Sequence, residues 1–135
     1  MKAQSAIEYI AIITIGLFIL IPMIVYLNDL YISYRNENKL SSAKTAASKI
    51  VSISDWVFSQ GEPAKNIIQV YIPADVEKIY FTNNSIIIRL DMGSSYQEVV
   101  DYSIANLYGN ITEREGYYYL LIQAIDNGVN ISVVS

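Results

Sequence analysis

Uncharged and mostly apolar residues run without interruption from Tyr9 to Leu27. As a helix this run would span roughly 28 Å at about 1.5 Å per residue, close to the ~30 Å hydrocarbon thickness of a bilayer. A cleaved secretory signal would have a shorter apolar region followed by a small-residue cleavage site, and the stretch 26–31 offers no such site. The pattern therefore predicts a membrane-length helix (9–27) that is retained on the protein.

Past Asn28 the chain becomes more polar, but apolar residues recur at spacings of three and four, which indicates an amphipathic helix. Gly61 and the following Pro63 are typical helix stop signals. We therefore expect one long helix over 4–60, with Pro22 as a candidate kink; the alternative is two helices with a joint near Asn28. The expected buried stripe consists of Leu40, Ala43, Ala47, Ile50, Val51, Ser54, Val57 and Phe58, with Lys39, Lys44 and Lys49 on or near the opposite side.

From Asn66 onward the hydrophobic period changes to two, as in β-strands. The pairs Asn83-Asn84 and Asp126-Asn127 with Gly128 are turn signals between apolar runs. The turn at 126–130 faintly resembles a calcium loop, but it lacks the full ligand spacing and the terminal glutamate. We expect five to seven short strands in a β-rich head domain (66–135), and an α+β fold in which the long helix carries a small antiparallel β-sheet or β-sandwich.

Twelve tyrosines occur in the chain, and three of them stand in a row at 117–119. Alternation along a strand puts Tyr118 on one face and its two neighbours on the other. Some tyrosine must then lie near the surface, where it serves contact with other subunits or adhesion. The alternative for any single tyrosine is the ordinary preference of strands for aromatic residues.

The amino-acid composition argues against several classes of function. The 135 residues carry a formal net charge of −4 and neither cysteine nor histidine. There is thus no basic footprint for nucleic acid, no thiolate site, and no histidine to act as general base or metal ligand. We predict no catalytic residues, cofactor site or metal site, and we expect that the protein is not an enzyme.

Three N-glycosylation sequons begin at Asn83, Asn110 and Asn130. All three fall in the predicted head domain, and none falls in the predicted helix. A used sequon requires an exposed position in an exported protein. Chance occurrence in a chain rich in asparagine and serine is the alternative.

The first nine residues carry the most specific motif. Lys2, Ala3 and Gln4 are followed by Ser-Ala-Ile-Glu-Tyr and then by the apolar run. This segment resembles the class III signal peptide of archaeal type IV pilin-like proteins. The resemblance implies cleavage by a prepilin peptidase between Ala3 and Gln4, with residues 1–3 as the leader peptide. Ala6 stands where many members of that family carry serine.

Cleavage there would make Glu8 the fifth residue of the mature chain, the position where pilins keep an acid. A carboxylate in the first turn of a helix is favoured by the helix dipole. We expect Glu8 to pair with the N-terminal ammonium of a neighbouring subunit during assembly. The alternative is a carboxylate that only reaches water at the membrane interface.

The resemblance implies a pilin that polymerises through its N-terminal helix into an extracellular filament on the archaeal cell surface, serving adhesion. Its expected partners are other pilin subunits, the prepilin peptidase and, before polymerisation, the membrane and a pilus assembly platform; nucleic acid is not expected. Alternatives are a membrane-anchored cell-surface domain that does not polymerise, a minor pilin, and an archaellum-like subunit.

Overall fold

The computed structural model describes residues 1–134 and consists of one helix and seven strands. Helix α1 spans Lys2–Gln60, and the α+β fold expected from the sequence is confirmed. The strands are β1 (Lys65–Ile72), β2 (Val76–Thr82), β3 (Ser85–Asp91), β4 (Tyr96–Tyr102), β5 (Leu107–Gly109), β6 (Gly116–Ile125) and β7 (Gly128–Val134).

The chain divides into two compact units, Met1–Asn36 and Glu37–Ser135. The N-terminal unit is helical from Lys2 onward, and the helix continues through Pro22 and Asn28. Pro22 has no backbone N–H, so one helical hydrogen bond is lost there without ending the helix. The hydroxyl of Thr14 donates to the Ile10 carbonyl at 2.7 Å, which keeps this polar group satisfied inside an apolar run.

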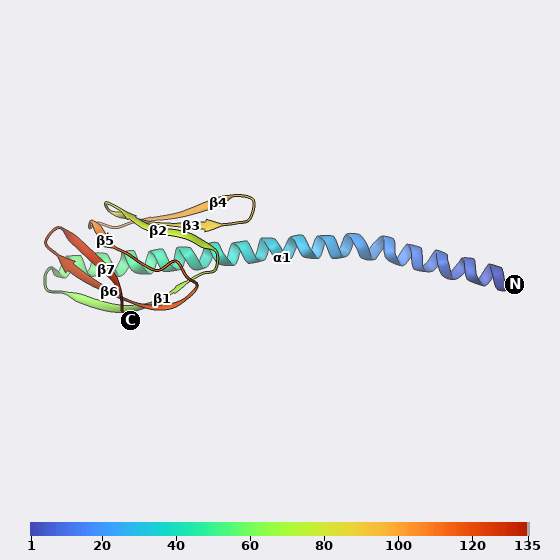
Figure 1. Cartoon of the computed structure of the whole chain (residues 1–135), viewed down its shortest axis with the longest axis horizontal. Coiled ribbons are helices and arrows are strands. Elements are labelled where there is room, and N and C mark those ends of the chain that lie inside the picture. Colours follow the sequence, from blue (N-terminus) through green and yellow to red (C-terminus); the bar gives the residue numbers. More distant parts are fainter. Residues whose placement is uncertain (135) are drawn as a thin grey trace. The chain divides into compact units, whose positions relative to one another are not determined.

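The C-terminal unit combines the last turns of α1 with two sheets (Figure 1). One sheet has four strands in the order β1-β6-β7-β5, and the other has three in the order β2-β3-β4. Strand β1 pairs antiparallel with β6, from Lys65 opposite Gln123 to Ile72 opposite Gly116. Turns at 83–84 and 126–127 connect β2 to β3 and β6 to β7, as the turn signals predict.

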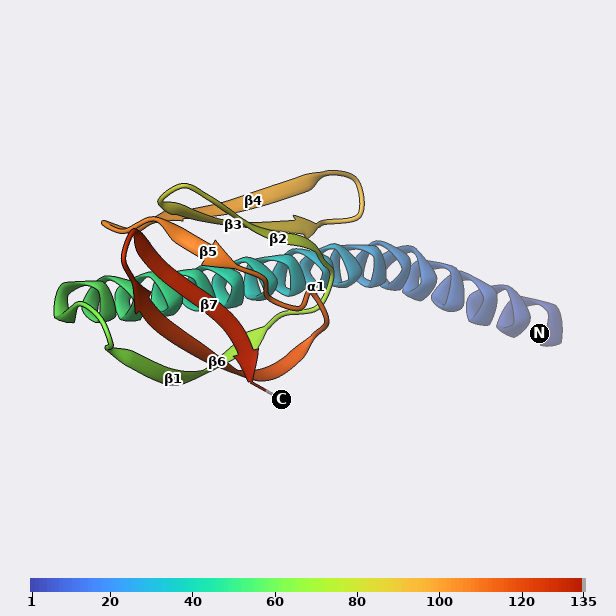
Figure 2. The same ribbon diagram turned by 60° about the vertical axis from the view of Figure 1, so that its left-hand side comes forward.

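The two sheets form a curled layer around residues 37–60 of α1 (Figure 2). Strand β5 of the larger sheet contacts β2 of the smaller one, so the layer is continuous from β1 to β4. The outer edges of this layer are β1 and β4, and both lie beside the helix. One groove is lined by residues of α1 and β1, and another is lined by residues of α1 and β4. The helix face between these edges stays open and carries Thr45, Ser48 and Ser52.

The core of this unit lies between the apolar stripe of α1 and the inward faces of both sheets. The stripe agrees with the predicted one from Ala43 to Val57, and Ala46 also belongs to it. Phe58 was expected in the stripe, but 37% of its surface is exposed. It lies in the last turn of α1 and at the margin of the stripe, so the sheets do not cover it.

The prediction that the stalk lysines lie opposite the stripe is wrong for Lys39. Its side chain is 12% exposed, and its ammonium forms an ion pair with Asp75. Lys49 is exposed, and its ammonium donates to the Gln69 carbonyl on β1 at 2.7 Å. Long lysine stems can lie along an apolar surface while the charged end reaches a polar partner, so both residues tie the helix to the strands.

Strand β5 departs from the antiparallel pattern expected for the head domain. It pairs with β7 in parallel, with Leu107 opposite Val129 and Gly109 opposite Ile131. The chain enters β5 from the other sheet through residues 103–106, so no hairpin sets the strand direction. A Cβ on Gly109 would lie 1.8 Å from the Ile131 carbonyl oxygen, so only glycine permits this approach of the two backbones.

A polar cluster holds the 103–106 connection against the helix. One carboxylate oxygen of Asp55 accepts from the Ser103 hydroxyl at 2.5 Å and from the Ile104 N–H at 3.0 Å. The Ser103 hydroxyl accepts in turn from the Ala105 N–H, and the Asn84 side chain donates to the Ser103 carbonyl. One helix side chain thereby fixes the segment that links the two sheets.

We expect Asp55→Ala to destabilise the C-terminal unit by about 1–3 kcal/mol, because two donors lose a charged acceptor. Thermal unfolding of the full chain in detergent, followed by near-ultraviolet circular dichroism, measures this change. Glu113→Ala is the matched control, since it removes one carboxylate from an exposed loop position. Equal melting temperatures for the two variants would contradict the role assigned to Asp55.

Candidate functional site

The apolar segment 9–27 of α1 is exposed around its whole circumference. Its most apolar 18-residue window has a mean hydropathy of 2.8, and none of that window is buried. Large side chains on every side of the helix, such as Ile12, Phe18 and Leu20, keep at least half of their surface exposed. A helix that is apolar all round requires hydrocarbon or other helices as its surroundings.

Helix α1 is the one helix among residues 1–134 that is long and apolar enough to cross a membrane. The N-terminal helix expected from the sequence is therefore present, with the length and composition of a membrane anchor. The same surface is suited to helix bundling, because a bundle core and a bilayer both remove apolar side chains from water.

Ala3 and Gln4 lie in the first turn of α1, and both are exposed. The Ser5 N–H donates to the Met1 carbonyl at 3.3 Å, so the leader residues are part of the helix in the uncut chain. Cleavage between Ala3 and Gln4 stays a prediction.

Glu8 is exposed and lies directly before the apolar segment. In the uncut chain α1 begins at Lys2, so Glu8 lies in the second turn; it would reach the first turn only after removal of the leader. Within residues 1–134 of one chain, Glu8 forms no hydrogen bond or ion pair. The described part of the chain thus brings no partner to Glu8.

The three sequon asparagines are all exposed, but they occupy different backbone settings. Asn83 lies in the β2–β3 turn with a positive φ of 49°, and Asn110 directly follows β5. Asn130 lies within β7, opposite Gln123 of β6 and Tyr108 of β5. The sequence predicts a final strand over 129–134, which includes Asn130, and the structure confirms this strand as β7. It also predicts a candidate short strand over 106–111, whereas β5 ends at Gly109 and leaves Asn110 just outside it.

The tyrosine row at 117–119 follows the alternation expected from its sequence. Tyr117 and Tyr119 are exposed on β6, whereas Tyr118 is half-buried against the core. Tyr71 on β1 lies beside Tyr117, with ring centroids 5.0 Å apart. The Tyr71 hydroxyl donates to Glu115 at 2.9 Å, and this hydrogen bond raises the pKa of Tyr71.

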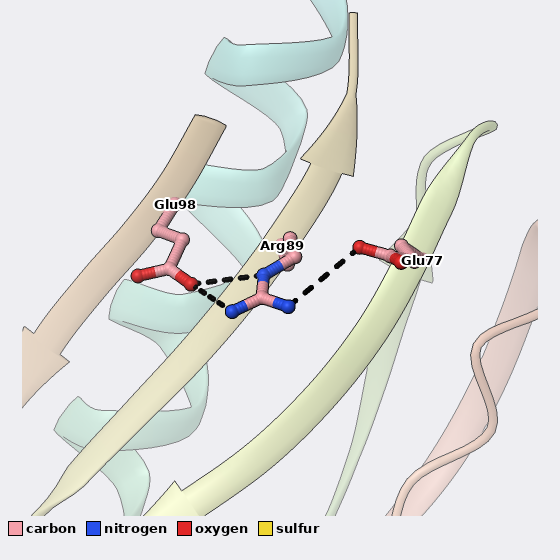
Figure 3. A network of polar contacts seen from close by, with 3 residues as sticks. All are labelled: Glu77, Arg89 and Glu98. Carbon is pink, nitrogen blue, oxygen red and sulfur yellow. Dashed lines mark hydrogen bonds and ion pairs between the residues drawn. The ribbon is translucent and has the colours of Figure 1, made fainter. Parts of the chain in front are cut away.

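The outer face of the three-stranded sheet has a different character, because ion pairs cross it (Figure 3). The guanidinium of Arg89 donates twice to one oxygen of Glu98, at 2.9 and 2.7 Å, and lies 3.9 Å from Glu77. The hydrogen bond to Glu98 raises the pKa of Arg89 further. Sequence reasoning missed this contrast between the two outer faces. The presence of charged residues in each of the segments 76–82, 85–91 and 96–102, against their near absence from 116–134, could have indicated it.

Compared with protein-family models, curated proteins and solved structures, the chain matches none of them. The architecture itself, a long apolar N-terminal helix followed by a small sheet-rich unit, is consistent with a pilin-like fold.

We expect Phe18→Asp, near the middle of the apolar segment, to weaken partitioning of the full chain into vesicles. A carboxylate at the centre of a membrane helix costs about 2.5–3.5 kcal/mol, which corresponds to on the order of 100-fold. Binding titrated against vesicle concentration measures the effect. Tyr34→Asp, on the same helix beyond the apolar segment, is the control, and a similar loss from both variants would contradict insertion of 9–27.

Proposed function

We propose that this protein is a structural subunit of an archaeal type IV pilus-like filament and polymerises through its N-terminal helix. The observation that carries the proposal is the combination of segment 9–27, apolar all round and exposed, with a single acid, Glu8, directly before it. The leader motif at residues 2–9 supports the same assignment, because it resembles a prepilin peptidase site.

In this proposal the peptidase removes Met1–Ala3 on the cytoplasmic side and leaves Gln4 as the new N-terminus. The leader contains one cationic side chain, Lys2, so the formal charge changes from −4 to −5. The subunit then waits in the membrane with its C-terminal unit outside. An assembly platform, implied by the resemblance, extracts the subunit into the growing filament.

Bundling is driven by the same apolar surface that holds the monomer in the bilayer. The side chains of 9–27 leave lipid and pack against the helices of neighbouring subunits, where dispersion contacts and the exclusion of water hold them. The C-terminal units coat the outside of the bundle. No reaction is catalysed, and polymerisation is the activity of the protein.

Glu8 gives the assembly its register in this proposal. A carboxylate within an apolar bundle is costly unless it is paired. The ammonium of a neighbouring Gln4 supplies the opposite charge at the same depth, because cleavage places this amine four residues before Glu8. A subunit inserted at the wrong height leaves both charges unpaired.

Adhesion to surfaces or to other cells follows from the filament coat. Exposed Tyr96 on β4 offers aromatic contact area, and the sequons at Asn83, Asn110 and Asn130 are candidate glycan sites. A membrane-anchored domain that never polymerises remains the second candidate, since the length of segment 9–27 alone satisfies an anchor. The two candidates differ in whether the N-terminus is cut.

The experiment that separates them is N-terminal sequencing of the native protein from a sheared filament fraction. We expect Gln4 with a free amine as the first residue of an abundant filament protein. A pyroglutamate start would establish the same cleavage but would remove the ammonium that the pairing with Glu8 requires. A chain that starts at Met1 or Lys2 and is found only in membranes would favour the anchored domain.

We expect Glu8→Gln to lower filament yield at least tenfold while the subunit remains in the membrane. Loss of one member of a buried pair costs about 3–5 kcal/mol, because the other charge stays unpaired. Quantifying subunits in sheared and membrane fractions measures the change. Glu37→Gln, an equal charge change at an exposed position of the same helix, is the control. Normal filaments from Glu8→Gln would remove the pairing from the proposal.

A further inference from the structure

The outer face of the four-stranded sheet carries a single charged side chain among its strand residues, that of Lys65 at the start of β1. We call the neutral face the outward side chains of 67–71 on β1, 117–123 on β6 and 130–134 on β7, together with Tyr108 on β5. Its exposed apolar and aromatic members are Ile67, Tyr108, Tyr117, Tyr119 and Val134. Its polar groups are amides, the Ser132 hydroxyl and the tyrosine hydroxyls. Charged residues appear only at its border, where Lys65 lies opposite Gln123 and Glu115 accepts from Tyr71.

The composition of the chain does not explain this face, because the other sheet has the opposite character. Arg89, Glu98 and Glu77 form ion pairs on the outward side of β2, β3 and β4 (Figure 3). Exposed ion pairs suit a face that stays in water, where charges keep their hydration. A face without charges avoids the cost of burying them, and interface cores are accordingly poor in charge and rich in tyrosine.

We propose that the neutral face is a docking surface for a second copy of this chain within the filament; this inference rests on the proposed function. Each cut copy has a formal charge of −5, so two copies repel each other where their acidic surfaces meet. The neutral face is where one copy can approach another without that repulsion. Tyr117 and Tyr119 supply rigid contact area, with their hydroxyls able to bond across the contact.

The size of the neutral face explains why such a contact needs the filament. The face covers about eighteen residue positions, and at about 4.8 Å between strands and 3.3 Å along each strand these give roughly 300 Å². A stable isolated interface buries about 800 Å² on each partner. The face is therefore too small to hold a dimer of separate subunits, and it acts when bundled helices raise the local concentration of neighbours.

Asn130 lies on the neutral face, so docking there determines whether this residue can carry a glycan. A glycan on Asn130 would stand between the two copies, so docking and modification at this residue exclude each other. Asn83 and Asn110 lie outside the face, in a turn and after a strand end. Intact mass with glycopeptide mapping of filament protein is expected to show Asn130 unmodified, whatever the state of the other two.

The chain has no native cysteine, so a single introduced thiol can report whether the neutral face is covered in filaments. Gln69→Cys places one thiol on the neutral face, and Val100→Cys places one on the outer face of the other sheet. We expect maleimide labelling of Gln69→Cys to be at least tenfold slower in filaments than in detergent-dispersed subunits. Val100→Cys is expected to label at similar rates in both states.

A charge placed on the face tests its role in assembly. Tyr119→Glu changes a side chain that is 54% exposed on β6, and Tyr102→Glu makes the same change where 68% is exposed on β4. We expect Tyr119→Glu to reduce filament yield at least fivefold and Tyr102→Glu to leave it within twofold. Melting of both variants in detergent verifies that each C-terminal unit is folded.

The outcomes separate this inference from the proposed function. Filaments with Gln69→Cys labelled as fast as in detergent, or with a glycan on Asn130, would overturn the docking surface and leave the pilin assignment intact. A chain that forms no filaments and keeps its leader would overturn both. Slow labelling of Gln69→Cys in filaments would show that the neutral face is covered there, even if Tyr119→Glu fails to fold.

Discussion

The constraint on which the rest of this structure depends is that the side chains of residues 9–27 cannot remain in water. One chain offers them no cover, because they point outward in every direction from a single helix. At roughly 25 cal/mol per Å² of apolar surface, even half of such a segment outweighs the stability of a typical small domain. A helix with this surface is suited to a bilayer or to a bundle of helices, because both remove its side chains from water.

The C-terminal unit, in contrast, covers the apolar stripe of its helix with strands of the same chain. The same helix that is apolar all round at its start is amphipathic after Glu37, where small alanines let strands approach. A layer of seven strands closes around this half and leaves one polar helix face open. Three polar contacts join the helix to the rest of the unit where apolar packing ends: Asp55 to the 103–106 connection, Lys39 to the β1–β2 connection, and Lys49 to β1.

Sequence alone predicted the elements well, because they rest on local periodicity. The long helix, the alternation around Tyr118 and the turns at 83–84 and 126–127 all follow from spacing and turn chemistry. The parallel pairing of Leu107 with Val129 could not be predicted, since it depends on how a chain crosses between sheets. Lys39 was misplaced because an ion pair with Asp75 outweighs the expectation that lysine faces water. The cleavage site and the role of Glu8 rest on a motif that a single folded chain does not test.

The order of the strands has a consequence for how the protein is made. Strand β7, the last of the chain, lies inside the larger sheet between β6 and β5, and β1 finds its partner β6 some fifty residues downstream. Closing such distant pairs is slow compared with forming helix. The C-terminal unit cannot complete its larger sheet until residues 128–134 have been synthesised. A chain terminated before β7 would leave both β5 and β6 with open edges.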